Sequence, residues 1–207
     1  MSRSLKRASP LIPYVAVAIG LYCLGSAWVA IVSYHVAMLA LVVRGRGLED
    51  RPSEKRAMSG WWYLSSAVFA LGGVALYVLW PHAFADSSAV AGRLASLGLG
   101  SRVWPYFAVY FCCANSLAEE LFWRGYLRQD CRRPVANDFA FAGYHALVLV
   151  AFAGPVWAVP VFVGCAFAGW LWRMMRSASG SIAIPVLTHF AADLSIVIAV
   201  QLRIRHW

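Results

Sequence analysis

Ionisable side chains interrupt otherwise apolar stretches at three places in the C-terminal half of the chain. These residues are Glu119, Glu120, Arg124, His145, His189 and Asp193. An ionised side chain at the centre of a membrane helix costs about 2.5–3.5 kcal/mol on insertion scales, and such residues usually mark a function. Carboxylates and imidazoles are also the groups that most often transfer protons in catalysis. The three clusters therefore indicate one catalytic site.

Helical spacing assigns different roles to the two neighbouring glutamates. Glu120 and Arg124 are four residues apart, so they share one helix face and can form an ion pair. Glu119 is rotated from Glu120 by about 100° and is free to point elsewhere. We expect Glu120 with Arg124 to be structural and Glu119 to be available for chemistry. A glutamate–arginine pair alone could equally tie helices together.

The histidines lie on two further apolar segments. His145 stands inside segment 138–153, and His189 and Asp193 share one face of segment 181–203 because they are four residues apart. Exposing such polar side chains to lipid costs free energy, so they should face the interior of the bundle. The three segments must therefore pack around a common cavity if the clusters are to meet.

The composition is that of a membrane protein. Of the 207 residues, 61% are hydrophobic and 13% are charged, against about 45–50% and about 25% in soluble domains. The net charge of +9 comes from basic residues that stand between long apolar runs. This placement is typical of cytoplasmic loops that face anionic headgroups, and it argues against a nucleic-acid partner.

A helix needs about 20 apolar residues to cross the hydrocarbon core. We expect an all-α, polytopic transmembrane bundle of six or seven spans, with a short surface helix at 86–99. The predicted spans are 11–43, 61–80, 104–128, 138–153, 156–176 and 181–203.

Segment 11–43 decides between six and seven spans. As one helix it would be about 50 Å long, which exceeds a core of about 30 Å. A hairpin broken near Gly20–Ser26 would place 14 of the 18 Lys and Arg residues on one side, as the positive-inside rule favours. Each arm would then be barely long enough, so both counts stay open. In either arrangement the loop 124–137 is cytoplasmic.

Other reactive side chains lack a supporting pattern. His35, His82 and His206 have no partner spacing, and we expect no role for them in the site. The five cysteines show no paired spacing, which argues against disulfides and zinc knuckles. Cys112 and Cys113 precede the glutamates by seven residues, about 10 Å along a helix, which is too far for a direct contact.

The three motifs EExxxR, FxxxH and HxxxD occur in this order, each on its own apolar segment. This set resembles the CPBP family, the CAAX-protease and bacteriocin-processing intramembrane proteases also called Abi. The resemblance covers roughly residues 104–200. It divides the chain into N-terminal membrane spans and loops over residues 1–103 and a catalytic core over residues 104–207.

The resemblance implies a mechanism. Glu119 would be the general base, with His145 as its partner in holding a water molecule, while Glu120 and Arg124 brace their helix. His189 and Asp193 would donate hydrogen bonds to the oxyanion. Asp193 departs from members that carry Asn there, and an ionised Asp cannot donate. It would have to be protonated, or would instead orient and charge His189.

A metal alternative is also open. Glu119, His145 and His189 suit metal ligands, with Asp193 behind them. The family has been described both as metalloproteases and as metal-independent glutamic proteases. The usual helical zinc signature HExxH is absent from the sequence. We favour the glutamic type with no cofactor, and the alternative cofactor is zinc or another divalent metal.

The predicted function is hydrolysis of a peptide bond in a membrane-associated or C-terminally anchored protein, within the bilayer of a bacterial inner membrane. Some bacterial relatives serve C-terminal protein sorting. A prenylated CAAX substrate is disfavoured because bacteria generally lack prenylated proteins. The partners would be a protein or peptide substrate and the lipid bilayer, with no nucleic acid. Two alternatives are a non-catalytic membrane scaffold or immunity protein and a small proton-coupled transporter.

Overall fold

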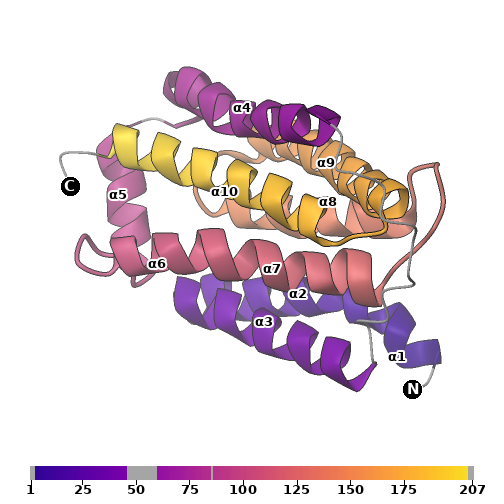
Figure 1. Cartoon of the computed structure of the whole chain (residues 1–207). Coiled ribbons are helices and arrows are strands. Elements are labelled where there is room, and N and C mark those ends of the chain that lie inside the picture. The colour runs from indigo at the N-terminus through magenta and orange to yellow at the C-terminus, as the bar shows by residue number, and fades with distance from the viewer. Residues whose placement is uncertain (1–2, 46–59, 85, 205–207) are drawn as a thin grey trace.

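The structure is a computed structural model, and it describes residues 3–45, 60–84 and 86–204. All regular secondary structure in these ranges is helical, which confirms the all-α prediction. Most helices run side by side along one direction, and α5 lies across one end of the bundle (Figure 1). The N-terminal elements are α1 (Arg3–Ala8), η1 (Ser9–Leu11), α2 (Ile12–Val17), η2 (Ala18–Cys23), α3 (Ala27–Arg44), α4 (Gly60–Ala83) and α5 (Ser87–Ser96).

The C-terminal part begins with a helical stretch over residues 104–126. Its pieces are α6 (Trp104–Tyr110), η3 (Phe111–Asn115), α7 (Ser116–Glu120) and η4 (Leu121–Tyr126), and both η3 and η4 are π-helical. The remaining elements are α8 (Ala136–Val150), η5 (Pro155–Trp157), α9 (Ala158–Ser179) and α10 (Ala183–Arg203).

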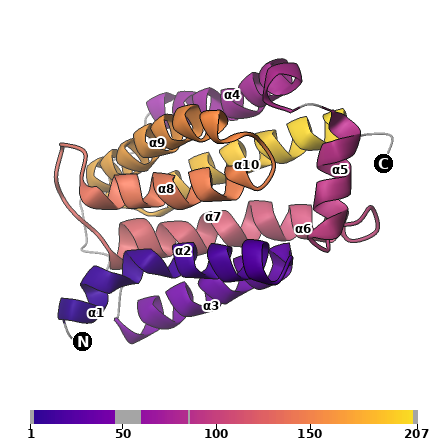
Figure 2. The same ribbon diagram turned by 180° about the vertical axis from the view of Figure 1, so that it is seen from behind.

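Segment 11–43 folds as a helical hairpin. The first arm ends at Cys23 and the second begins at Ala27, with Gly25 in the left-handed region at φ 59°. Ser26 caps the second arm by accepting a hydrogen bond from the backbone N–H of Val29. The arms lie side by side (Figure 2) and approach closely, because a Cβ on Gly20 would lie 2.4 Å from the backbone nitrogen of Ala30. The chain thus adopts the hairpin alternative.

The number of long apolar helices is smaller than the number of predicted spans. Within the described residues, three helices are long and apolar enough to cross a membrane: Ala27–Arg44, Pro155–Ser179 and Ala183–Arg203. A fourth arises if Ala67–Ala83 and Ser87–Ser96, which meet at 104°, form one broken span. The other apolar segments are shorter or divided, as in the 15-residue α8 and the π-interrupted stretch 104–126. These helices indicate an integral membrane protein, and they do not confirm the prediction of six or seven spans.

The stretch 104–126 occupies the middle of the bundle (Figures 1 and 2). On one side it contacts α10, which packs along α4, and on the other side α3 contacts both α7 and η4. Helix α8 packs along α9 and also reaches α2. The central stretch therefore meets helices from both halves of the chain.

Candidate active site

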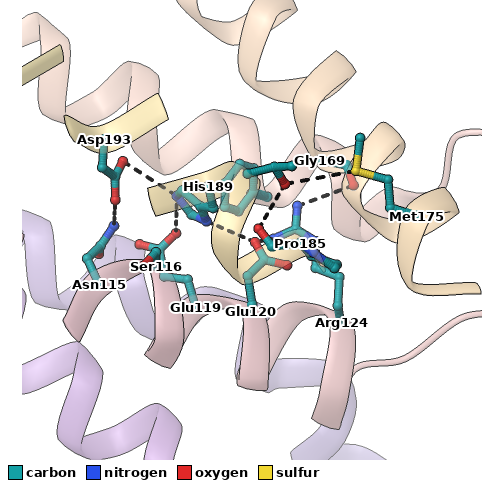
Figure 3. Close-up of polar contacts among 12 residues, drawn as sticks. Asn115, Ser116, Glu119, Glu120, Arg124, Gly169, Met175, Pro185, His189 and Asp193 are labelled. Carbon is teal, nitrogen blue, oxygen red and sulfur yellow. Dashed lines mark hydrogen bonds and ion pairs between the residues drawn. The ribbon is translucent and has the colours of Figure 1, made fainter. Parts of the chain in front are cut away.

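The six ionisable residues predicted from the sequence converge in the middle of the bundle. Glu119 and Glu120 belong to α7, Arg124 to η4, His145 to α8, and His189 with Asp193 to α10. Figure 3 shows five of them pointing toward one another, linked by ion pairs and hydrogen bonds. The short helix α7 lies between two π-helical turns, a feature frequent at functional sites. The packing predicted from the inward-facing polar groups therefore brings these groups together.

The two carboxylate oxygens of Glu119 have different surroundings. Oε1 accepts a hydrogen bond from the Tyr34 hydroxyl at 3.0 Å. Oε2 lies 4.0 Å from His145 Nε2 and 3.9 Å from His189 Nε2. Among the described residues it has no hydrogen-bond partner, and the side chain is fully buried. Separations of about 4 Å are too long for direct hydrogen bonds, and they leave room for a bridging molecule such as water.

His145 has a defined tautomer when it is neutral. Its Nδ1 lies 2.8 Å from the carbonyl oxygen of Phe141. A carbonyl only accepts, so Nδ1 carries the hydrogen and Nε2 offers a lone pair toward Glu119. The side chain is 25% exposed, whereas the other five residues of the cluster are buried. His145 is therefore the member of this cluster that a substrate can reach first.

His189 stands between two carboxylates. Its Nδ1 lies 2.9 Å from Glu120 Oε1, and its Nε2 lies 3.6 Å from Asp193 Oδ1. The ring stacks on Trp172, with centroids 4.2 Å apart and an interplanar angle of 18°. When protonated, such an imidazole donates from both nitrogens, and Nε2 then offers a hydrogen toward the gap beside Glu119.

The predicted pair of Glu120 and Arg124 is present. Arg124 Nη1 donates to Glu120 Oε1 at 2.9 Å, and Nη2 donates to the carbonyl oxygen of Gly169 at 3.2 Å. The guanidinium lies over the rings of Phe141 and Trp172, at 4.4 and 5.2 Å. Glu120 Oε1 also contacts His189, so the glutamate joins the bracing arginine to the histidine.

Asp193 is held from the central stretch. Asn115 Nδ2 donates to Asp193 Oδ2 at 3.1 Å, while Oδ1 faces His189 (Figure 3). Asp193 Oδ2 accepts a hydrogen bond from the Asn115 amide, as an ionised carboxylate does. Of the two roles that the sequence leaves open for Asp193, this placement agrees better with orienting His189.

Four polar residues of this region were not expected in the site: Tyr34, His35, Asn115 and Tyr144. His35 is buried and its Nε2 lies 3.1 Å from Asn115 Oδ1, although we expected no role for it. The Tyr34 hydroxyl lies 2.5 Å from the same oxygen, and the Tyr144 hydroxyl lies 3.4 Å from His145 Nε2. Asn115 precedes Glu119 by four residues, a helical spacing that could have revealed it. Of the other two histidines, His82 is exposed and His206 lies outside the described residues.

The donor set also suits a divalent metal ion. Glu119, His145 and His189 each offer one ligand atom, and these atoms lie within 4.8 Å of one another. One carboxylate with two imidazoles is a set that zinc proteases use. Each histidine binds an oxygen through its other ring nitrogen, as metal-ligating histidines do. The residues present therefore fit such an ion.

Comparison with known proteins gives a family match for the segment that contains these residues. Residues 101–195 match the Rce1-like family model, described as type II CAAX prenyl endopeptidase Rce1-like. The matched segment contains all three motifs, and the match confirms the resemblance to the CPBP family of CAAX proteases. Comparisons with curated proteins and with solved structures gave no match. The family and the apolar helices together support a CAAX-type protease in a membrane.

Proposed function

We propose that the protein is an intramembrane endopeptidase that hydrolyses a peptide bond of a membrane-associated or C-terminally anchored protein. The observation that carries this proposal is Glu119 Oε2, a buried carboxylate oxygen without a hydrogen-bond partner among the described residues. The Nε2 atoms of two histidines face it at about 4 Å. The family match over the same segment supports a proteolytic reaction.

A count of donors and acceptors supports water as the occupant of this gap. One water molecule can donate to Glu119 Oε2 and to His145 Nε2, and it can accept from a protonated His189. Glu119 then takes a proton as the water oxygen attacks the peptide carbonyl carbon, and His189 Nε2–H turns to the developing oxyanion. The amide C–N bond breaks when Glu119 passes that proton to the leaving nitrogen.

The same three residues would hold a divalent ion, which when bound would supply a Lewis acid for the water and the carbonyl. We propose the glutamic mechanism because one water molecule satisfies all three groups when His189 is protonated. Treatment with a chelator should therefore leave proteolysis unchanged. Loss of activity on chelation, restored by zinc, would assign Glu119, His145 and His189 to a metal centre.

The direct test uses purified protein in proteoliposomes with two model substrates. One is a reporter protein anchored by a C-terminal membrane helix, and the other is a farnesylated CAAX peptide. We expect cleavage of the anchored reporter and a loss of about 10²–10⁴-fold in Glu119→Gln and in His145→Ala, the usual contribution of a general base. Unchanged cleavage by a folded Glu119→Gln variant would refute the assignment of Glu119 as the general base. Cleavage of the farnesylated peptide alone would move the substrate to the prenylated class.

We further propose seven membrane crossings and a cytoplasmic loop 127–135 in a bacterial inner membrane. The crossings would be the two arms of the hairpin, α4, the stretch 104–126, α8, α9 and α10. Cys23 at the hairpin tip and Cys131 in the loop are both exposed, free thiols. In single-cysteine variants, a membrane-impermeant maleimide should label Cys23 from the periplasm and Cys131 from the cytoplasm. Protection of Cys23 from both sides would instead contradict two crossings by the arms of this hairpin.

A further inference from the structure

Helix α3 lies outside the matched segment 101–195, yet two of its side chains enter the polar cluster. Tyr34 and His35 are 5% and 2% exposed, and they lie in the otherwise mostly apolar sequence of α3. Their rings contact each other edge to face, with centroids 4.5 Å apart. Two adjacent buried polar residues on a membrane helix need hydrogen-bond partners, and both find them around the predicted catalytic carboxylates.

His35 begins a directional chain of hydrogen bonds that ends at Asp193. Asn115 Nδ2 faces Asp193 Oδ2 at 3.1 Å, so Asn115 Oδ1 must accept from the opposite side. His35 Nε2, 3.1 Å from that oxygen, is therefore the donor. In a neutral ring Nδ1 is then an acceptor, and the Tyr110 hydroxyl lies 2.9 Å from it. The chain fixes the orientation of the Asn115 amide and supplies Asp193 with one donor.

Tyr34 acts on the other carboxylate. Its hydroxyl lies 3.0 Å from Glu119 Oε1 and 2.5 Å from Asn115 Oδ1. The hydroxyl thus occupies the oxygen of Glu119 that does not face the histidines. In the same way Asn115 occupies the oxygen of Asp193 that does not face His189. Each carboxylate is thus connected to α3 through one oxygen, directly in Glu119 and through Asn115 in Asp193. The other oxygen of each carboxylate faces the histidines.

We propose that Tyr34 and His35 are positioning residues, which orient Glu119 directly and Asp193 through Asn115, so that α3 completes the active site. The inference rests on the proposed proteolytic function and adds residues from outside the motif-bearing segment. Tyr34 and His35 do not touch the gap beside Glu119 Oε2. They act by holding the oxygens on the far sides of two carboxylates.

The experiment measures kcat and KM for the anchored reporter in proteoliposomes, together with the melting temperature of each variant. Tyr34→Phe and His35→Leu remove the two hydrogen-bonding groups. His35→Gln keeps an amide N–H close to the position of His35 Nε2 and serves as the conservative rescue. The matched control is Gln201→Leu, which removes a hydrogen bond of 2.6 Å from Trp104 Nε1 that joins the stretch 104–126 to α10, away from the cluster.

We expect kcat to fall about tenfold in Tyr34→Phe, as for the loss of one hydrogen bond to a charged group, with KM within about twofold. In His35→Leu the lost bond goes to a neutral amide oxygen, so we expect a fall of about fivefold in kcat, again with KM within about twofold. His35→Gln should recover most of the lost kcat, and Gln201→Leu should keep the wild-type value. Wild-type kcat in both Tyr34→Phe and His35→Leu would overturn this inference and leave the proposed function standing. An equal loss in His35→Gln and His35→Leu would also overturn it, since the ring and not its hydrogen bond would then matter. If the wild type cleaves neither model substrate, the proposed function fails, and the inference falls with it.

Discussion

Among the residues that the structure describes, two buried pairs each join an acidic residue to an arginine, and they differ in how many of their carboxylate oxygens have a hydrogen-bond partner. Arg124 contacts Glu120 at 2.9 Å, and Arg173 contacts Asp138 at 2.8 Å. All four side chains are almost fully buried. Residue types, burial and shortest distances are therefore nearly the same, so the role of each pair must be read from its remaining contacts.

The pair of Asp138 and Arg173 is fully hydrogen-bonded at its carboxylate. Arg173 Nε donates to Oδ1 at 3.1 Å and Nη2 donates to Oδ2 at 2.8 Å, while the backbone N–H of Val135 also donates to Oδ2 at 2.9 Å. Arg173 further donates to the loop carbonyl oxygens of Cys131 and Arg133. This pair fastens the loop 127–135 to α8 and α9, which is a structural role.

The pair of Glu120 and Arg124 leaves hydrogen-bonding capacity unused. Only Oε1 of Glu120 is engaged, and it serves both Arg124 and His189. Within the described residues, Oε2 has no hydrogen-bond partner. A buried polar atom left unsatisfied requires an explanation, and proximity to a reactive centre is one. The comparison indicates that the pair with a fully hydrogen-bonded carboxylate stabilises the fold, whereas the pair with an unpartnered carboxylate oxygen adjoins the proposed catalytic site.

The largest expected effect follows from removing Arg173. Arg173→Leu leaves the Asp138 carboxylate buried without its cation, so the free energy of unfolding should fall by about 3–5 kcal/mol. Denaturant unfolding in detergent would measure this loss. Trp170→Phe is the matched control, because it removes one loop contact, Trp170 Nε1 to the Arg132 carbonyl oxygen at 2.8 Å, at a cost of about 1 kcal/mol. Equal losses of unfolding free energy in the two variants would contradict the structural role assigned to Arg173.

Glu120→Gln should show the reverse balance, with activity more affected than stability. The change keeps the shape of the side chain but removes the charge beside His189 Nδ1. A hydrogen bond to a charged group contributes about 1.5–3 kcal/mol, so kcat should fall about ten- to a hundredfold. Steady-state cleavage of the anchored reporter measures this. If Glu120→Gln kept wild-type kcat and instead unfolded as easily as Arg173→Leu, both pairs would be structural.

The sequence predicted one of these pairs and missed the other. Glu120 and Arg124 lie on the same stretch four residues apart, so helical periodicity alone predicts their contact. Asp138 and Arg173 are 35 positions apart and meet only because α8 packs along α9. Hydropathy located the helices, but it could not determine which of them are neighbours.

The same limit explains the residues missed in the site. The spacing of His189 and Asp193 indicated a shared face, and the structure places these two side chains 3.6 Å apart. His35 has no polar partner at helical spacing on α3, since its partners Tyr110 and Asn115 come from another stretch. Contacts between helices of distant sequence position depend on tertiary packing, which a local pattern does not specify.

An exposed ion pair in the loop 127–135 should make the smallest contribution to the free energy of unfolding. Arg128 Nε donates to both carboxylate oxygens of Asp130, at 3.1 and 3.2 Å, and the Asp130 side chain is 58% exposed. Exposed pairs contribute about 0.2–1 kcal/mol, so Asp130→Asn should be several times milder than Arg173→Leu. The hydrogen bond from Arg128 lowers the pKa of Asp130 below its ordinary value.

The sign of this pKa shift fixes how the effect of Asp130→Asn depends on pH. A carboxyl group whose pKa is lower in the folded state stabilises the fold above its unfolded-state pKa of about 3.9, and this contribution disappears as the pH falls through the folded-state value. The difference in unfolding free energy between wild type and Asp130→Asn should therefore be present at neutral pH and vanish in acid. Paired unfolding curves at neutral and strongly acidic pH would measure it. A difference that persisted in acid would mean that Asp130 acts through packing and not through its charge. The exposed pair would then no longer contrast with the buried pair of Asp138 and Arg173.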